Sequence, residues 1–125
     1  MNVPFPKYAS EQSWQNAYKL RRLVYEITKR FSPSELRRVS QMRDAARSIK
    51  QNIQEGYGKS LGEYIHSLEI SKGSLRELSG DMDDCFDDGL ITSEEFGKLN
   101  ELCGKTDYLL MRLIQSLRQK IPNKP

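Results

Sequence analysis

The sequence has few of the side chains from which enzyme and metal sites are most often built. Among its 125 residues are one histidine, His66, and two cysteines, Cys85 and Cys103. A single histidine excludes most schemes in which a histidine activates a serine or cysteine nucleophile. The two cysteines are not spaced as metal ligands. We therefore expect no catalytic residue, no metal and no cofactor.

Two weak signals for chemistry remain. Glu63 and His66 form an E-x-x-H pair on one helix face, but a di-iron site in a helical bundle needs two such pairs and two more glutamates. We expect His66 to be a surface residue. Glu77, Asp81 and Asp84 share a face, as Mg²⁺-binding carboxylates of an all-α nucleotide pyrophosphohydrolase would. No second carboxylate pair on a facing helix accompanies them, so an enzyme is the least favoured interpretation.

Long hydrophobic runs are also missing. No apolar stretch approaches the roughly 18 residues of a membrane helix, and no basic-then-apolar leader opens the sequence. We therefore expect a cytoplasmic protein. Charged residues make up 30% and apolar residues 37%, which is too apolar for disorder. Cys85 and Cys103 are expected to be small buried residues of a reducing compartment, too far out of register for a disulfide.

Residues at the helix ends predict four helices. A capping box, in which serine or threonine is followed three residues later by glutamate, predicts a helix start. Three occur: Ser32 with Glu35, Ser60 with Glu63, and Thr92 with Glu95. Gly58 and Gly89 stand where helix C-termini need a positive φ. The predicted helices cover about 10–31, 33–57, 61–88 and 93–120, in a domain of residues 10–121. An extended arm over 1–9, which holds Pro4 and Pro6, precedes the domain, and a tail over 122–125 follows it.

Within each predicted helix, apolar residues recur three and four positions apart, as in helices packed in a bundle. The predicted core positions, in chain order, are Ala17, Leu20, Val24, Ile27, Phe31, Leu36, Val39, Met42, Ala46, Ile49, Ile53, Leu61, Leu68, Leu75, Leu78, Met82, Cys85, Leu99, Cys103, Leu110, Leu113 and Leu117. Short connections require neighbouring helices to run antiparallel. The predicted fold class is all-α, an antiparallel up-and-down four-helix bundle.

Some apolar residues fall outside these core positions, namely Trp14, Tyr18, Tyr25, Leu109 and Ile114. The last two helices also carry glycines at heptad spacing, Gly73 with Gly80 and Gly97 with Gly104. A glycine inside a helix costs about 1 kcal/mol relative to alanine, so its repetition on one face indicates close approach of another backbone. Two interpretations stay open: tight packing inside the bundle, or a subunit interface.

Charge is unevenly distributed along the chain. The net charge is +3, yet residues 60–89 hold eight acidic and two basic residues, whereas residues 33–59 hold six basic and three acidic ones. Arg43, Arg47 and Lys50 stack at i, i+4 and i+7, and Arg21 and Arg22 can widen this basic stripe. Such a stripe can follow phosphates without reading bases, although a solvated helix flank is the alternative. The candidate nucleic-acid-binding residues are Arg37, Arg38, Arg43, Arg47, Lys50 and Lys59.

The acidic run DMDDCFDD, residues 81–88, lies near a helix C-terminus, where negative charge is unfavourable. Asp83 with Asp87, and Asp84 with Asp88, are like-charge pairs four residues apart. Positive charge is expected to relieve them. Its source is left open between solvent counterions, basic residues of another subunit or partner, and a divalent cation.

Two longer strings resemble a known family. They are QMRDAARSIKQNIQEGYGKS (41–60) and EYIHSLEISKGSLREL (63–78). Together with the pattern W-x-x-A-x-x-L-x-x-x-V-Y over 14–25, they are similar to the 23S rRNA intervening-sequence protein family of bacterial four-helix-bundle proteins. The resemblance covers about residues 14–80. It implies an up-and-down bundle that assembles into a ring-like homopentamer. The architecture resembles the accessory protein of diversity-generating retroelements, which binds nucleic acid and a reverse transcriptase. The biochemical role of the family is not established.

The resemblance also implies a set of candidate oligomer-interface residues. Polar residues on an otherwise packed helix are expected to form hydrogen bonds between helices or between subunits. Asp44, Arg47 and Lys50 depart from the family pattern. The candidate interface residues are Asn52, Glu55, Tyr57, Tyr64, Lys72, Gly73, Ser74, Glu77 and Gly80.

The function favoured by the sequence is that of a non-enzymatic oligomeric bundle, which binds RNA or DNA through a basic face on the first two helices. The alternative is a scaffold that docks a basic partner or a reverse-transcriptase-like protein at the acidic end of the third helix, without nucleic acid.

Overall fold

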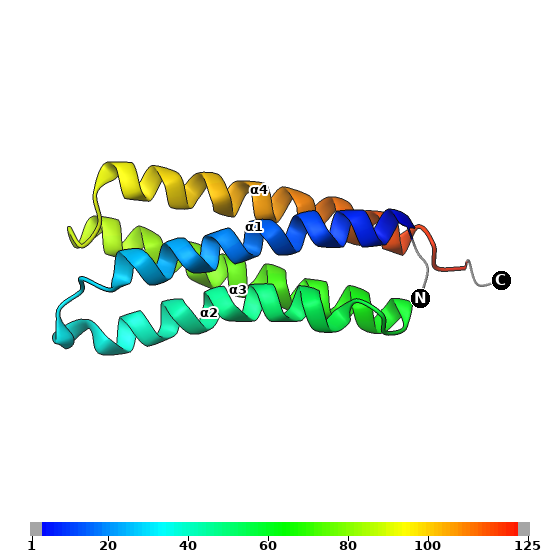
Figure 1. The fold of residues 1–125 in the computed structure, drawn as a ribbon, viewed down its shortest axis with the longest axis horizontal. Coiled ribbons are helices and arrows are strands. Elements are labelled where there is room, and N and C mark those ends of the chain that lie inside the picture. The colour runs from blue at the N-terminus through cyan, green and yellow to red at the C-terminus, as the bar shows by residue number, and fades with distance from the viewer. Residues whose placement is uncertain (1–3, 123–125) are drawn as a thin grey trace.

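Four long helices form the structure, a computed structural model that describes residues 4–122 and their side chains from residue 9 onward. They are α1 (Pro4–Thr28), α2 (Leu36–Gly56), α3 (Leu61–Asp87) and α4 (Ser93–Arg118), and a short 3₁₀ helix, η1 (Pro33–Glu35), precedes α2. Figure 1 shows them side by side along one axis. The all-α, up-and-down bundle predicted from the sequence is confirmed.

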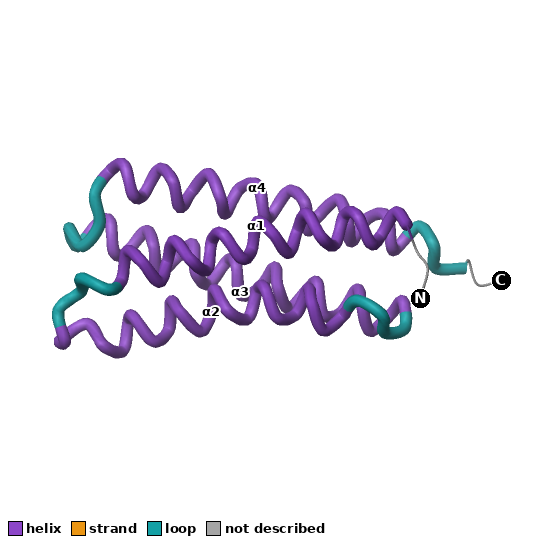
Figure 2. The backbone as a smooth tube through the Cα atoms, in the orientation of Figure 1, coloured by secondary structure: helices purple, strands orange, loops and turns teal. Residues whose placement is uncertain are grey.

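Each helix packs against two others. Among the described residues the backbone of α1 packs beside α2 and α4, and that of α3 packs beside α2 and α4. Across the α1–α3 diagonal the helices meet through side chains, as in the hydrogen bond between Ser10 and Tyr64. The α1–α2 side of the bundle is therefore opposite the α3–α4 side. The α1–α2 and α3–α4 connections lie at one end of the bundle, and the α2–α3 turn lies at the other end with the start of α1 and the end of α4 (Figure 2).

The core contains most of the predicted positions, while Phe31, Val39 and Leu61 are only partly buried. Leu20, Met42 and Leu68 are completely buried. Leu36 is an exception, with 69% of its surface exposed, because the first residue of α2 lies at the end of the bundle, where no neighbouring helix covers it. Ile114 differs in the opposite way, because it is buried although it is not among the predicted core positions.

Helix ends agree well with the capping signals from Ser60 onward. The Ser60 side chain accepts a hydrogen bond from the Glu63 amide, and Thr92 and Glu95 form a reciprocal capping box. Ser32 differs, since its side chain caps the short 3₁₀ helix η1 instead of α2. The two glycines after α2 and α3, Gly58 and Gly89, have φ of +96° and +74° as predicted.

The N-terminal helix is longer than the sequence predicted. α1 begins at Pro4, so the extended arm predicted for residues 1–9 is wrong for 4–9, and its first three residues lie outside the described range. Prolines in a first helical turn remove no hydrogen bond, because the first four amides of a helix have no intrahelical acceptor. Pro4 and Pro6 therefore start this helix and do not exclude it. Of the predicted tail, 123–125 also lie outside the described range.

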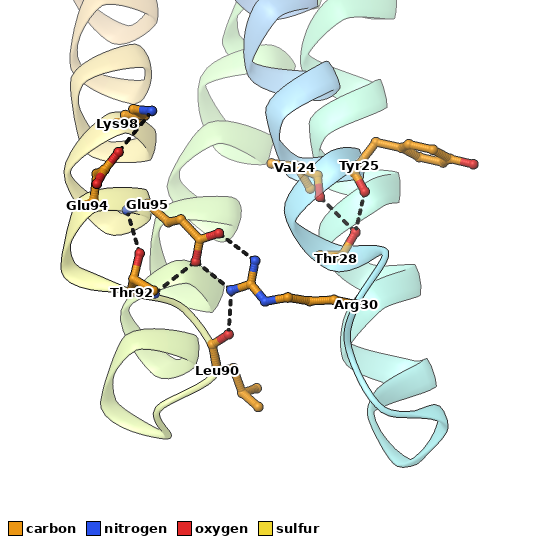
Figure 3. Close-up of polar contacts among 9 residues, drawn as sticks. All are labelled: Val24, Tyr25, Thr28, Arg30, Leu90, Thr92, Glu94, Glu95 and Lys98. Carbon is orange, nitrogen blue, oxygen red and sulfur yellow. Dashed lines mark hydrogen bonds and ion pairs between the residues drawn. The ribbon is translucent and has the colours of Figure 1, made fainter.

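One clasp joins the end of α1 to the start of α4 (Figure 3). The Arg30 guanidinium donates to both Glu95 carboxylate oxygens, each at 2.5 Å, and to the Leu90 carbonyl at 3.0 Å. Glu95 also accepts from the Thr92 amide at 2.9 Å. The hydrogen bond from Arg30 is the main cause that lowers the pKa of Glu95 below its usual value. We call Arg30, Leu90, Thr92 and Glu95 the end clasp.

Both cysteines are free and buried, as expected. The Cys85 thiol lies 3.5 Å from the Met42 sulfur, and the Cys103 thiol lies 3.7 Å from the Met82 sulfur. Burial raises the pKa of Cys103 to about 11 and also raises that of Cys85. Between residues 4 and 122, no helix is both long and apolar enough to cross a membrane.

Candidate nucleic-acid interface

Side chains at matching helical spacing gather on the α1–α2 side of the bundle. We call them the aromatic–basic face: Trp14, Tyr18, Arg21 and Tyr25 from α1, with Arg43, Arg47, Lys50 and Gln54 from α2. In each helix the four residues are at i, i+4, i+7 and i+11, which places them along one stripe. Because α1 and α2 are antiparallel neighbours, the start of one stripe lies beside the end of the other.

At one end of this face Arg43 of α2 is fixed against α1. Its guanidinium carbon lies 4.2 Å from the centre of the Tyr25 ring. Its Nε donates to the Thr28 hydroxyl at 3.0 Å, and Nη2 reaches the Tyr25 carbonyl at 3.5 Å. The Tyr25 ring points away from α4 (Figure 3) and is 38% exposed. Arg43 is thus held beside an exposed aromatic ring.

The middle of the face is a small basic hollow of about 180 Å³. Arg21, Arg43 and Arg47 line it, together with Tyr25 and one acidic residue, Asp44. Within residues 4–122, neither Arg21 nor Arg47 has an ion-pair partner. Two arginines are therefore available here for a ligand of opposite charge.

At the other end the only tryptophan, Trp14, stacks on Tyr18, with ring centres 5.4 Å apart and planes 15° apart. The Trp14 indole N–H donates to the Gln54 side chain at 3.2 Å, and the Lys50 ammonium lies 5.7 Å from the indole centre. Tyr18 is 43% exposed. Beside Trp14 is a hollow of about 510 Å³, which Ile53, Gln54 and Tyr57 line with residues of α1.

The structure brings together only three of the six predicted nucleic-acid-binding residues, Arg43, Arg47 and Lys50. Lys59 lies in the α2–α3 connection at the end of the bundle. Arg37 and Arg38 lie at the opposite end, where they line a separate hollow of about 350 Å³.

Arg38 is already paired within the chain. It forms ion pairs with Glu35 at 3.0 Å and with Asp88 at 2.9 Å, and its hydrogen bond to Asp88 is the first of the causes that raise its pKa. The acidic run at the end of α3 is therefore relieved in part by α2 of the same chain, a source that the sequence analysis did not consider. The two residues are 50 positions apart in the chain, so no local pattern links them.

Other carboxylates of that run remain without a basic partner. Asp83, Asp84 and Asp87 are exposed and have no ion pair among the described residues. Burial, followed by the charges of Glu77 and Asp84, raises the pKa of Asp81. In the part of the chain that the structure describes, no cluster of three or more His, Cys, Asp or Glu side chains could hold a metal ion.

Several candidate interface residues are engaged inside one chain. Tyr64 is buried; its hydroxyl is hydrogen-bonded to the Ser10 hydroxyl, and Tyr57 packs edge-on against its ring. Burial raises the pKa of Tyr64. Because only 5% of Tyr64 is exposed, its side chain cannot contact a second copy in this conformation.

The polar candidates of α2 and α3 form a short internal network. The Asn52 amide donates to the Ser48 carbonyl at 2.9 Å and lies 3.2 Å from the Ser48 hydroxyl. Ser48 and Ser74 share a hydrogen bond of 2.8 Å between α2 and α3, and Lys72 pairs with Asp107 of α4 at 3.5 Å. Among the described residues Asn52 therefore bonds within its own helix, and the inter-helix hydrogen bond of this network is the one between Ser48 and Ser74. Glu55, Gly73, Glu77 and Gly80 are exposed.

The heptad-spaced glycines of α3 and α4 face outward. A Cβ added at Gly73, Gly80, Gly97 or Gly104 would meet no atom of a neighbouring element within 4 Å, so the interpretation that they allow tight packing inside the bundle is wrong. They belong to a repeat that the sequence analysis missed, G-x-L-x-E-L-x-G, which occurs at 73–80 and again at 97–104. Both copies bury their first leucine toward the core and turn their glycines to solvent.

The aromatic members of the aromatic–basic face were also missed as site residues. From the sequence, Trp14, Tyr18 and Tyr25 are recognised only as apolar residues outside the predicted core positions. Their spacing of four and seven residues, interrupted by Arg21 at the same face, was the available signal. Their alignment with the basic stripe of α2 depends on how the two helices pack.

Comparisons with known proteins agree on family and fold. Residues 10–112 match the family described as 23S rRNA-intervening sequence protein. The crystal structure of a protein of unknown function from the S23 ribosomal protein family, from Bacteroides thetaiotaomicron, has a TM-score of 0.70 to this chain at 19% sequence identity. The match covers 88% of this chain and 97% of that one, and at this identity it shows the fold. No curated protein matches the chain.

Proposed function

The chain belongs to the 23S rRNA-intervening sequence protein family, and from this premise we propose that it is a non-enzymatic, oligomeric bundle that binds nucleic acid through the aromatic–basic face. The single observation that carries the proposal is the presence of two arginines, Arg21 and Arg47, that have no ion pair among the described residues and lie between two cation-flanked aromatic rings. Four basic side chains lie on this face, and Lys29 lies 5.3 Å from the centre of the Tyr25 ring. The acidic residues beside it are Asp44, in the basic hollow, and Glu11, in the hollow next to Trp14. Such a surface attracts a polyanion and gives salt-dependent affinity.

Removal of the free cations tests this proposal. We expect Arg21→Gln/Arg47→Gln/Lys50→Gln to lose most affinity for a labelled oligonucleotide, measured by fluorescence anisotropy. Arg43 is left in place because its contacts with Thr28 and Tyr25 support the fold. Affinity of the native chain should fall with salt, with a slope of log K on log salt near −2 to −3 for about three to four phosphate contacts.

The matched control removes three cations from α4 and the residues after it, Lys98→Gln/Lys105→Gln/Lys120→Gln, and changes net charge equally. These lysines are exposed, and Lys98 and Lys105 form only surface pairs with residues four positions earlier. We expect the control to retain most of its affinity. Equal losses in the two triple variants would mean that binding follows net charge alone, and the aromatic–basic face would not be the site.

Assembly is proposed to use the opposite side of the bundle, and the proposed state is a homopentamer. The outward glycines of the two G-x-L-x-E-L-x-G repeats leave room for another backbone, and Ile70, Tyr108 and Met111 are exposed hydrophobic residues of the same two helices. A light-scattering mass near five chains is the expected result. The mass of a single chain at all concentrations would contradict it.

A second candidate function is a protein scaffold that docks a basic partner or a reverse-transcriptase-like protein. The exposed carboxylates of Asp83, Asp84 and Asp87, without ion pairs among the described residues, favour it. A basic protein ligand would then lose affinity in Asp83→Asn/Asp87→Asn and keep it in the Arg21/Arg47/Lys50 variant. The opposite pattern would exclude the scaffold.

A further inference from the structure

The aromatic rings on the aromatic–basic face are not needed to bind the outside of a duplex. A protein that follows duplex phosphates needs cations and hydrogen-bond donors, and an aromatic ring adds little to a contact with phosphate oxygens. Tyr18 and Tyr25 are 43% and 38% exposed. Both lie on this face together with its cations, and this shared placement points to a common role for the rings and the charges.

Stacking geometry indicates what this role is. Trp14 and Tyr18 lie nearly parallel, with planes 15° apart, so the pair forms a flat platform whose partly exposed ring is Tyr18. A nucleic-acid base is a flat ring that stacks on aromatic side chains whatever its sequence, because every base has a π-face. In a duplex both faces of each base are already covered by its neighbours, so only an unpaired base can use this platform.

Cations lie beside and between the rings along this face. Lys50 lies beside the Trp14 ring and Arg43 beside the Tyr25 ring, and Arg21 and Arg47 line the hollow nearer Tyr25. At about 1.5 Å per residue the helix rises roughly 16 Å from Trp14 to Tyr25. This length suits a short segment of strand, at the low end of the roughly 4–16 nucleotides that single-strand-binding folds cover.

The hollow beside Trp14 adds a place for a base to enter. Its volume of about 510 Å³ is within the usual range of sites for small organic ligands, roughly 300–1,000 Å³. Ile53 and Tyr57 supply apolar surface to its wall, and Gln54 supplies an amide. An unpaired base could rest against this wall, while a paired base could not leave its stack to reach it.

We propose that the aromatic–basic face binds single-stranded nucleic acid, with unpaired bases stacked on Tyr18 and Tyr25 and phosphates beside Arg21, Arg47 and Lys50. This inference rests on the proposed function and narrows it from nucleic acid in general to unpaired strands. Contacts to phosphate and to the faces of bases carry little sequence information, so binding is expected to tolerate most sequences.

The single tryptophan makes the inference directly measurable. Trp14 is the only tryptophan in the chain, so its fluorescence reports contact at this face. The native protein is titrated with a uridine oligonucleotide, a thymidine oligonucleotide of equal length, and a hairpin duplex with the same number of phosphates. We expect both single strands to quench Trp14 and to bind about 10-fold or more tightly than the duplex. The ratio of the RNA to the DNA affinity identifies which strand is preferred.

Ring-deletion variants separate stacking from charge. In anisotropy titrations with labelled single strands, Tyr18→Ala and Tyr25→Ala should each weaken binding by about 5- to 100-fold. Tyr18→Phe keeps the ring and should bind like the native chain. Phe86→Ala is the matched control, because Phe86 is 37% exposed on α3, on the opposite side of the bundle, and its exposed fraction is close to that of Tyr25. It should leave affinity unchanged.

The outcomes distinguish the two proposals. Equal affinity for duplex and single strand, with Trp14 fluorescence unchanged and Tyr18→Ala without effect, would overturn stacking and leave nucleic-acid binding in place. Failure of all three oligonucleotides to bind at low salt would overturn the proposed function, and the stacking inference with it. Selective binding of single strands that Tyr18→Ala and Tyr25→Ala both weaken would establish the inference.

Discussion

Alanine in place of an outward glycine gives opposite predictions for the single chain and for its assembly. The change considered is Gly80→Ala in α3, with Gly104→Ala as the equivalent position of the second G-x-L-x-E-L-x-G repeat in α4. At each position a Cβ would meet no neighbouring atom within 4 Å. The methyl group therefore introduces no clash inside one chain, and only the backbone term of helix propensity changes.

The size of the effect follows from that term. Glycine in a helix interior is about 1 kcal/mol less favourable than alanine. Gly80→Ala should therefore stabilise the isolated chain by about 1 kcal/mol, which is roughly 4 °C in melting temperature for a domain of this size. The assay is urea unfolding followed by circular dichroism, at a concentration where light scattering gives the mass of one chain.

Gly56→Ala is the control with the opposite sign. A Cβ at Gly56 would lie 2.8 Å from the Ser67 Cβ and 2.9 Å from Tyr64 Cδ1, so α2 and α3 would have to move apart. Such overpacking costs about 1–3 kcal/mol. Destabilisation by Gly80→Ala, or no effect from Gly56→Ala, would refute the packing arrangement on which both predictions depend.

The same substitutions should weaken assembly although they stabilise the single chain. If the outward glycines admit the backbone of a second copy, a methyl group at Gly80 or Gly104 fills that space, and the light-scattering mass at a given concentration should fall. A variant that is more stable as a chain and less associated would identify the α3–α4 side as the interface. An unchanged mass, together with the gain in stability, would place the interface elsewhere.

Two further predictions concern titration and reactivity. The pKa of Glu95 is lowered mainly by Arg30. The end clasp therefore contributes stability that is fully present above the ordinary glutamate pKa, near 4.5, and is lost as pH falls through the lowered pKa of the folded state. In urea unfolding between roughly pH 3 and pH 7, Glu95→Gln should reduce this loss of stability at acid pH, and an unchanged loss would contradict the prediction. Burial raises the pKa of Cys85 and Cys103, so alkylation of the folded protein at mildly alkaline pH should be much slower than that of the urea-unfolded chain, and equal rates would show that the thiols are accessible.

Local signals in the sequence predicted most of the fold. Ser60, Thr92, Gly58 and Gly89 mark helix ends by contacts with their own immediate neighbours, so sequence alone places them. The start of α1 was missed because prolines are compatible both with an extended arm and with a first helical turn. Only the packing of the residues that follow decides between the two.

The candidate site could be predicted in part, for a similar reason. Arg43, Arg47 and Lys50 lie on one helix, so their periodicity placed them on one stripe. The aromatic half of the face belongs to another helix, and the rotation of α1 about its axis, which brings Tyr25 to Arg43, is set by tertiary packing. The pair of Arg38 with Glu35 is local and readable from the spacing of three residues, whereas the ion pair between Arg38 and Asp88 spans 50 positions and follows from no local pattern.

The pattern of neighbouring helices within residues 4–122 has a consequence for the order of folding. Of the four helix pairs whose backbones pack side by side, three join helices that are consecutive in the chain, and only α1–α4 joins its two ends. Local pairs lose little loop entropy on forming, so a chain of this contact pattern should fold quickly, with the α1–α4 pair closing last. The aromatic–basic face belongs to the first consecutive pair, and the end clasp belongs to the closing pair. During synthesis from the N-terminus, all residues of the aromatic–basic face are therefore made before α4, the helix that closes the bundle.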